Sequence, residues 1–124
     1  MAAPSADTAG RSFAPPALND AALYVYVADR PQPAVFGVTA NGASLGDLAS
    51  HTWMRVTLVP GAYDIRCTGG RSSTPSLMVD MAPGATRYVE LSRRWLEIGC
   101  DLREVPAATA QPAILAGKRV RELR

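Results

Sequence analysis

The chain has 124 residues, which is enough for one domain with a single core but not for two. Apolar residues make up 48% of the chain and charged residues 19%, so a folded body is expected. The net charge of +2 arises at the end of the chain, because the eight basic and eight acidic residues of 21–117 cancel. Nucleic-acid binding usually needs a basic stripe on the folded body. The charge distribution therefore excludes nucleic acid as the expected partner.

Residues 1–20 are rich in Ala, Pro and Ser and show no periodicity, which predicts a flexible N-terminal tether. Such a tether often follows the cleavage site of an exported protein or lipoprotein. We therefore expect a periplasmic or outer-membrane-anchored protein in which Met1 replaces a removed export signal. Contact with a membrane is expected only through a removed lipid anchor. The alternative is a cytosolic protein with a loose terminus.

Alternation of apolar and polar residues predicts seven or eight short strands between residues 21 and 105. They are expected at residues 22–28, 35–40, 43–48, 52–58, 63–67, 76–81, 87–91 and 95–104. Asn41-Gly42 predicts a type I′ hairpin, and Pro60-Gly61 predicts a second hairpin at the centre of the chain. Pro83-Gly84 predicts another turn. This pattern indicates an all-β fold, an antiparallel β-sandwich with one C-terminal helix.

The end of the chain is predicted to form a linker at residues 106–111 and a helix at residues 112–123, packed on the sandwich. Thr109 is the candidate cap of this helix. An apolar stripe would face the sheet. Its members are Ala113, Ala116, Val120 and Leu123.

Three stretches together resemble a family of small bacterial lipoprotein domains that is known only as a domain of unknown function. They are A-L-Y-V-Y, the stretch V-T-L-V-P-G-A-Y-D-I and the later M-V-D-M-A-P-G-A-T-R-Y-V-E-L. The strand–Pro-Gly–strand pattern is also similar to that of PEGA-type surface domains. The resemblance covers roughly residues 21–123 and implies a β-sandwich displayed in the envelope of a Gram-negative cell. It brings no catalytic motif, and this chain has no lipidation cysteine at its start.

Cys67 and Cys100 each fall on the apolar side of a predicted strand, so both can point into one core. In an oxidising compartment they would form a disulfide, and otherwise they would be two buried free thiols. No metal site or cofactor is predicted, because His51 is the only histidine and no close cysteine pair exists.

The candidate contact surface combines aromatic residues with arginines, which is the composition of interface hot spots. The candidates are Tyr24, Tyr26, Trp53, Arg55, Arg66, Arg71, Arg87 and Trp95, and Tyr88 lies on the same side of its strand. Arg71 belongs to the loop at residues 69–75, a second candidate surface. The alternative is that the aromatics cover the sheet or pack beneath the terminal helix. Asp64 and Glu90 alternate with arginines, which favours salt bridges over a pair of catalytic carboxylates.

The leading hypothesis is a non-enzymatic envelope module that binds another protein, in concrete form a periplasmic immunity or inhibitor protein that blocks a toxin or hydrolase. The second is a structural envelope lipoprotein or secretion-assembly component that binds cell-wall material through Trp53 or Trp95. An enzyme ranks last, because the sequence shows no convergent set of acid, base and nucleophile.

Overall fold

The computed structural model describes Phe13 and residues 16–27, 35–49, 52–68, 76–93 and 100–119. These residues form nine strands and one helix. Their bounds are β1 Ala21–Val27, β2 Val35–Ala40, β3 Ala43–Ala49, β4 Thr52–Leu58, β5 Gly61–Thr68, β6 Ser76–Met81, β7 Thr86–Arg93, β8 Cys100–Val105, α2 Ala107–Ala116 and β9 Lys118–Arg119.

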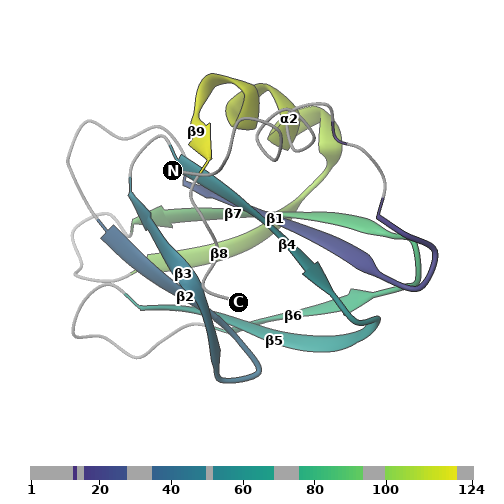
Figure 1. The fold of residues 1–124 in the computed structure, drawn as a ribbon. Helices are drawn as coiled ribbons and strands as arrows, with labels where there is room; N and C mark the ends of the chain where they lie inside the picture. The colour runs from purple at the N-terminus through teal and green to yellow at the C-terminus, as the bar shows by residue number, and fades with distance from the viewer. Residues whose placement is uncertain are drawn as a thin grey trace.

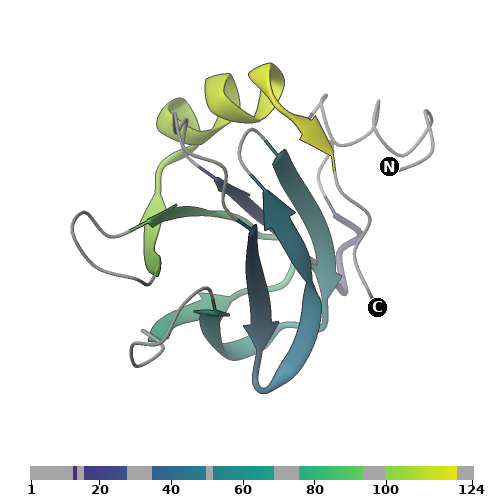
Figure 2. The same ribbon diagram turned by 90° about the vertical axis from the view of Figure 1, so that its left-hand side faces the viewer.

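The strands build two sheets that face each other (Figure 1). Sheet A has the strand order β8-β7-β1-β4-β9, and sheet B has the order β3-β2-β5-β6. Helix α2 lies on the side of sheet A that faces away from β5 and β6, and the view in Figure 2 shows the same arrangement after a quarter turn. The predicted β-sandwich with one C-terminal helix is confirmed. Besides eight full strands it contains β9, which has two residues.

Two of the seven strand pairings are parallel, β1 with β7 and β4 with β9, whereas the sequence predicted antiparallel sheets. The chain reaches β7 from β6, which belongs to the other sheet. Because no hairpin joins β7 to β1, nothing forces the two strands to run in opposite directions.

The two Pro-Gly turns connect the sheets and do not close hairpins. The hairpin predicted at Pro60-Gly61 is wrong, because β4 pairs in sheet A and β5 pairs in sheet B. Pro83-Gly84 likewise joins β6 of sheet B to β7 of sheet A, and Gly84 has a φ of 75°, which favours glycine. A hairpin within one sheet and a connection between two sheets give the same alternation of side chains. The sequence pattern therefore did not distinguish the two kinds of connection.

The predicted Asn41-Gly42 hairpin is confirmed, since β2 and β3 pair antiparallel across it. Asn41 has a φ of 50° and Gly42 a φ of 85°, as both central residues of a type I′ turn require. The pairing of β2 with β3 contains a bulge, because Thr39 opposes Ser44 while Val38 opposes Gly46. The extra residue of β3 is Leu45.

The core between the sheets is built from one side of each of the strands β1 to β8. The inner faces predicted for the strands of residues 52–58 and 76–81 are confirmed, for example by Met54, Val56 and Val79. The buried members of this core are Ala21, Leu23, Val25, Val27, Phe36, Val38, Ala40, Leu45, Leu48, Met54, Val56, Leu58, Ile65, Cys67, Val79, Met81, Val89, Leu91 and Cys100.

Helix α2 begins five residues earlier than predicted, so most of the expected linker is helical. The carbonyl of Pro106 accepts the first helical hydrogen bonds, and no side chain caps the helix, contrary to the prediction for Thr109. Ala110 and Ile114 are the buried residues, in place of the expected Ala113 and Ala116. Pro112, a residue type that is favourable in the first turn of a helix, here lies inside a helix that is rich in alanine. Val120 and Leu123 lie outside the described residues.

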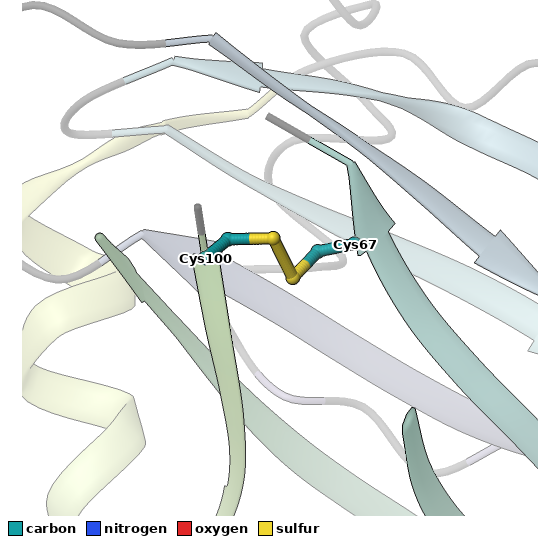
Figure 3. Close-up of a disulfide and its surroundings, with 2 residues drawn as sticks. All are labelled: Cys67 and Cys100. Carbon is teal, nitrogen blue, oxygen red and sulfur yellow. A yellow bond between two sulfur atoms is a disulfide. The ribbon is translucent and has the colours of Figure 1, made fainter. Parts of the chain in front are cut away.

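Cys67 and Cys100 form a disulfide, which confirms the bonded alternative (Figure 3). It joins the end of β5 in sheet B to the start of β8 in sheet A, with a Cα–Cα distance of 6.3 Å. Both cysteines belong to the core between the sheets. The bond therefore fixes the two sheets to each other at one end of the sandwich.

Candidate binding face

The outer face of sheet A is covered by α2 and forms a second core. Tyr24 and Trp53 are 0% exposed, Tyr26 is 2% exposed and Tyr88 is 6% exposed. The remaining buried members of this core are Ala22, Val105, Ala110 and Ile114. The aromatic residues therefore pack beneath the terminal helix, which is the alternative that the sequence left open. A partner protein or a glycan would have to displace the cover to reach Trp53.

The aromatic rings of this second core are stacked across three neighbouring strands. The Tyr24 ring lies between those of Trp53 and Tyr88, with centroid distances of 6.0 and 5.2 Å. Phe13, from the predicted tether, packs on the same rings and is 5.5 Å from that of Tyr24. Gln111 of α2 donates a hydrogen bond of 3.1 Å from Nε2 to the hydroxyl of Tyr88. Helix, sheet and Phe13 therefore share one set of contacts.

A charged network lies at the margin of the covered face. The Tyr26 hydroxyl donates a hydrogen bond of 2.9 Å to Oε2 of Glu90, whose Oε1 pairs with Nη2 of Arg103 at 2.8 Å. Burial, followed by the hydrogen bond and the charge of Glu90, raises the pKa of Tyr26 well above its ordinary value. Glu90 is thus in a salt bridge, as its alternation with arginine predicted.

The candidate arginines do not gather on one surface. Arg55 lies over the Tyr24 ring, 5.8 Å from its centroid, and belongs to the covered side. Arg87 was assigned to the side away from the core, but it alternates with Tyr88 and pairs at 2.9 Å with Glu104 of β8. It therefore shares the side of Val89, at the rim of the inner core. Of the candidate arginines that the structure describes, only Arg66 lies on the outer face of sheet B. Arg71, with the loop at residues 69–75, and Trp95 fall outside the described residues.

Helix α2 does not cover the outer face of sheet B, which we call the B face. Its side chains alternate with those of the inner core. The larger ones belong to Thr39, Asp47, Asp64, Arg66, Met78 and Asp80, four of which are exposed, and the small side chains of Ala62 and Ser76 lie on the same side. Met78 is 64% exposed, whereas its neighbour Val79 is 1% exposed.

The B face is acidic around an apolar residue. It carries three aspartates and one arginine, and Arg66 is held by Asp64 through Nε and Nη2, each 3.0 Å from Oδ2. Met78 lies directly across from Asp64 on the neighbouring strand. Asp64 is also tied by its main chain to Asn41 in the β2–β3 turn. The B face can therefore present an apolar side chain and carboxylates from rigid strands.

Sequence reasoning found Arg66 but missed Asp47, Met78 and Asp80 as parts of one surface. The predicted surface combined aromatic residues with arginines, and the described aromatics belong to the covered face. The available signal was the outward position of Met78, which alternates with Leu77 and Val79 and has an aspartate two residues on. A large apolar residue at an outward position of an uncovered strand is a candidate contact.

Within the described part of the chain, no group of three or more His, Cys, Asp or Glu residues is placed to hold a metal ion. Among the same residues, no helix has the length and apolar character needed to cross a membrane. Comparisons with family models, with curated proteins and with solved structures find no match to this chain.

Proposed function

We propose that this chain is a protein-binding module of the cell envelope and that the B face contacts the partner. The observation that carries the proposal is the difference between the two outer faces. The aromatics of sheet A are buried beneath α2, whereas sheet B presents Met78 at 64% exposure among charged side chains. An exposed apolar residue with a polar surround resembles the core and rim of a protein interface.

The charges of the B face indicate which chemistry it would bind. Asp47, Asp64 and Asp80 outnumber Arg66, and Asp64 already neutralises that arginine. Carboxylates repel phosphate groups and attract basic side chains, so the face favours a basic protein surface over nucleic acid. The partner we expect carries lysine or arginine around an apolar contact for Met78.

The disulfide supports an extracytoplasmic location. Such bonds persist in oxidising compartments and are rare in the cytosol. Cys67–Cys100 joins the two sheets, and together with the composition of residues 1–20 it favours a periplasmic or outer-membrane-anchored protein.

The concrete form that we propose is an inhibitor or immunity protein for a secreted hydrolase or toxin. Blocking such an enzyme requires a rigid complementary surface of standard size, about 800 Å² on each partner. Strands β2, β5 and β6 hold the B face in fixed register, and the disulfide anchors β5 to the other sheet. A face held in this way loses little conformational freedom on binding.

The experiment is capture of partners from envelope and secreted fractions with the full chain. Two matched variants each place a lysine at an exposed apolar position, Met78→Lys on the B face and Leu115→Lys on α2, where the native side chains are 64% and 50% exposed. We expect a stoichiometric protein to be retained by the wild type and by Leu115→Lys. Its retention should fall by about tenfold or more with Met78→Lys, because a buried apolar contact is lost and a basic partner is repelled.

Equal retention by both variants would contradict the B face as the contact surface. Loss with Leu115→Lys alone would assign binding to the covered side instead. Recovery of cell-wall material without any stoichiometric protein would replace the proposal with a structural role in the envelope.

A further inference from the structure

The free edges of the two sheets differ in how they are protected. Open strand edges invite pairing with other chains, and proteins usually shield them with charges, bulges or covering segments. Strand β8 carries charged side chains in its sequence C-D-L-R-E-V. Strand β4 is covered at Thr52 and Trp53 by β9. Strand β3 contains the bulge at Leu45.

Among the described residues, the edge strand β6 has neither a bulge nor a covering strand, and it carries a single charge. Its sequence S-L-M-V-D-M contains no proline, no basic residue and one acidic residue, Asp80. It pairs with β5 in unbroken register over six residue pairs. In the part of the chain that the structure describes, no strand pairs with its other side.

The hydrogen bonds of Asp64 show which groups of β6 point to this edge. The main-chain N–H of Asp64 donates to Oδ1 of Asn41 at 2.8 Å, and its carbonyl accepts from the N–H of Asn41 at 3.0 Å. Both groups of Asp64 therefore point toward β2 and away from β6. Met78, which opposes Asp64, is consequently in a non-hydrogen-bonded pair, so its own N–H and C=O point outward. The same holds two residues away, for Ser76 and Asp80.

We propose that the β6 edge binds an extended segment of the partner protein, which adds a fifth strand to sheet B. This inference rests on the proposed function and specifies how the partner is held. The main-chain groups of Ser76, Met78 and Asp80 form the ladder, as in other complexes formed by strand addition. Met78 and Asp80 are exposed two residues apart on the B face. The incoming strand therefore carries an apolar and a basic side chain, also two residues apart, on the matching face.

The probe is a short synthetic peptide with an acetylated N-terminus and an amidated C-terminus. Its repeating sequence is Thr-Val-Thr-Lys, so that valine and lysine lie two residues apart on one face of the strand. Amide hydrogen exchange of the full chain is followed by NMR as the peptide is added. We expect slower exchange at the amides of Ser76, Met78 and Asp80, by about tenfold at a peptide concentration ten times the dissociation constant. A peptide with N-methyl groups on its ladder-forming amides should give no protection.

Two variants separate the contribution of the Met78 main chain to binding from that of its side chain. Met78→Pro removes an outward N–H without removing a β5–β6 hydrogen bond, a position where an edge strand tolerates proline. Met78→Thr keeps the N–H and removes the apolar side chain. Protection of Ser76 and Asp80 should vanish with Met78→Pro and weaken with Met78→Thr. The unfolding midpoint of Met78→Pro confirms that the variant is folded before its exchange is interpreted.

Three results would overturn the inference: no protection at millimolar peptide, protection that survives N-methylation, or protection that survives Met78→Pro in a folded variant. Protection of the same amides by raising the protein concentration alone would also overturn it, because a second copy of the chain would then occupy the edge. The peptide experiment does not use the captured partner. If Met78→Pro and Met78→Thr lower the retention of the captured partner equally, the main chain of β6 adds nothing to binding, which refutes strand addition and leaves the proposed function standing.

Discussion

The outer face of sheet A and the B face are built by the same alternation of side chains, yet they have opposite character. Sheet A directs Tyr24, Trp53 and Tyr88 outward, and all three are buried beneath α2 and Phe13. Sheet B directs aspartates, Arg66 and Met78 outward, and most of these are exposed. The outward side chains of each sheet suit their surroundings. Burial beneath a helix is favourable for aromatic rings, whereas charged groups are more stable in water. The outer face of sheet A therefore contributes to the core, whereas the B face keeps most of its larger side chains exposed.

The strongest test of this comparison is a pair of truncations on the two faces. Trp53→Ala should cost about 3–5 kcal/mol of the free energy of unfolding, because it leaves a cavity beneath the covered face. Met78→Ala should change it by less than about 0.5 kcal/mol, since its side chain is already 64% exposed. Urea denaturation of both variants measures the difference. Similar costs at the two positions would mean that the faces are not distinct.

The disulfide is expected to have the next largest effect, because it holds together the sheets that carry the two faces. Replacing Cys67 and Cys100 with alanine should lower the free energy of unfolding by roughly 3–4 kcal/mol, the cost expected for a loop with a sequence separation of 33. Denaturant midpoints with and without reductant measure this. A wild type whose midpoint is unchanged by full reduction would contradict a role of the bond in stability.

Two adjacent residues of α2 sharpen the comparison further. Ile114 is 0% exposed and Leu115 is 50% exposed. Ile114→Ala should cost about 2–4 kcal/mol through the lost contact with sheet A, and Leu115→Ala under about 1 kcal/mol. Thermal unfolding of the pair provides a matched measurement within one helix. If Leu115→Ala is the more damaging change, the helix packs on the sheet through another side.

The smallest effect concerns Tyr26 at the margin of the covered face. Tyr26→Phe should cost about 1 kcal/mol at neutral pH, because the hydrogen bond to Glu90 is lost. Since burial raises the pKa of Tyr26 in the folded state, the hydroxyl ionises first in the unfolded chain, above about pH 10. The unfolded state then binds fewer protons, so the stability that Tyr26 contributes falls as pH rises further.

The wild type and Tyr26→Phe should therefore differ most at neutral pH and converge above about pH 10, as followed by urea unfolding at several pH values. A difference that grows with alkaline pH would contradict the buried, hydrogen-bonded hydroxyl.

The sequence predicted the inner core well and the outer faces poorly. Val56, Val79 and Leu91 face inward because strand alternation is a local property. Whether Pro60-Gly61 closes a hairpin depends on which sheet the next strand joins, and that is set by contacts distant in sequence. The aromatic candidates failed as a surface for the same reason: Tyr24 and Trp53 point outward as predicted, but the sequence pattern did not fix where α2 packs. Met78 was missed because an outward methionine is recognised only once its strand is known to be uncovered.

We propose that the covered face of sheet A stabilises the fold and that the B face binds the partner. The most direct test is hydrogen exchange measured by mass spectrometry on the full chain, alone and with the partner captured from the envelope or secreted fractions. We expect the partner to protect peptides from β5 and β6 and to leave the exchange of α2 unchanged. Protection confined to α2, with none in β5 or β6, would contradict the proposal.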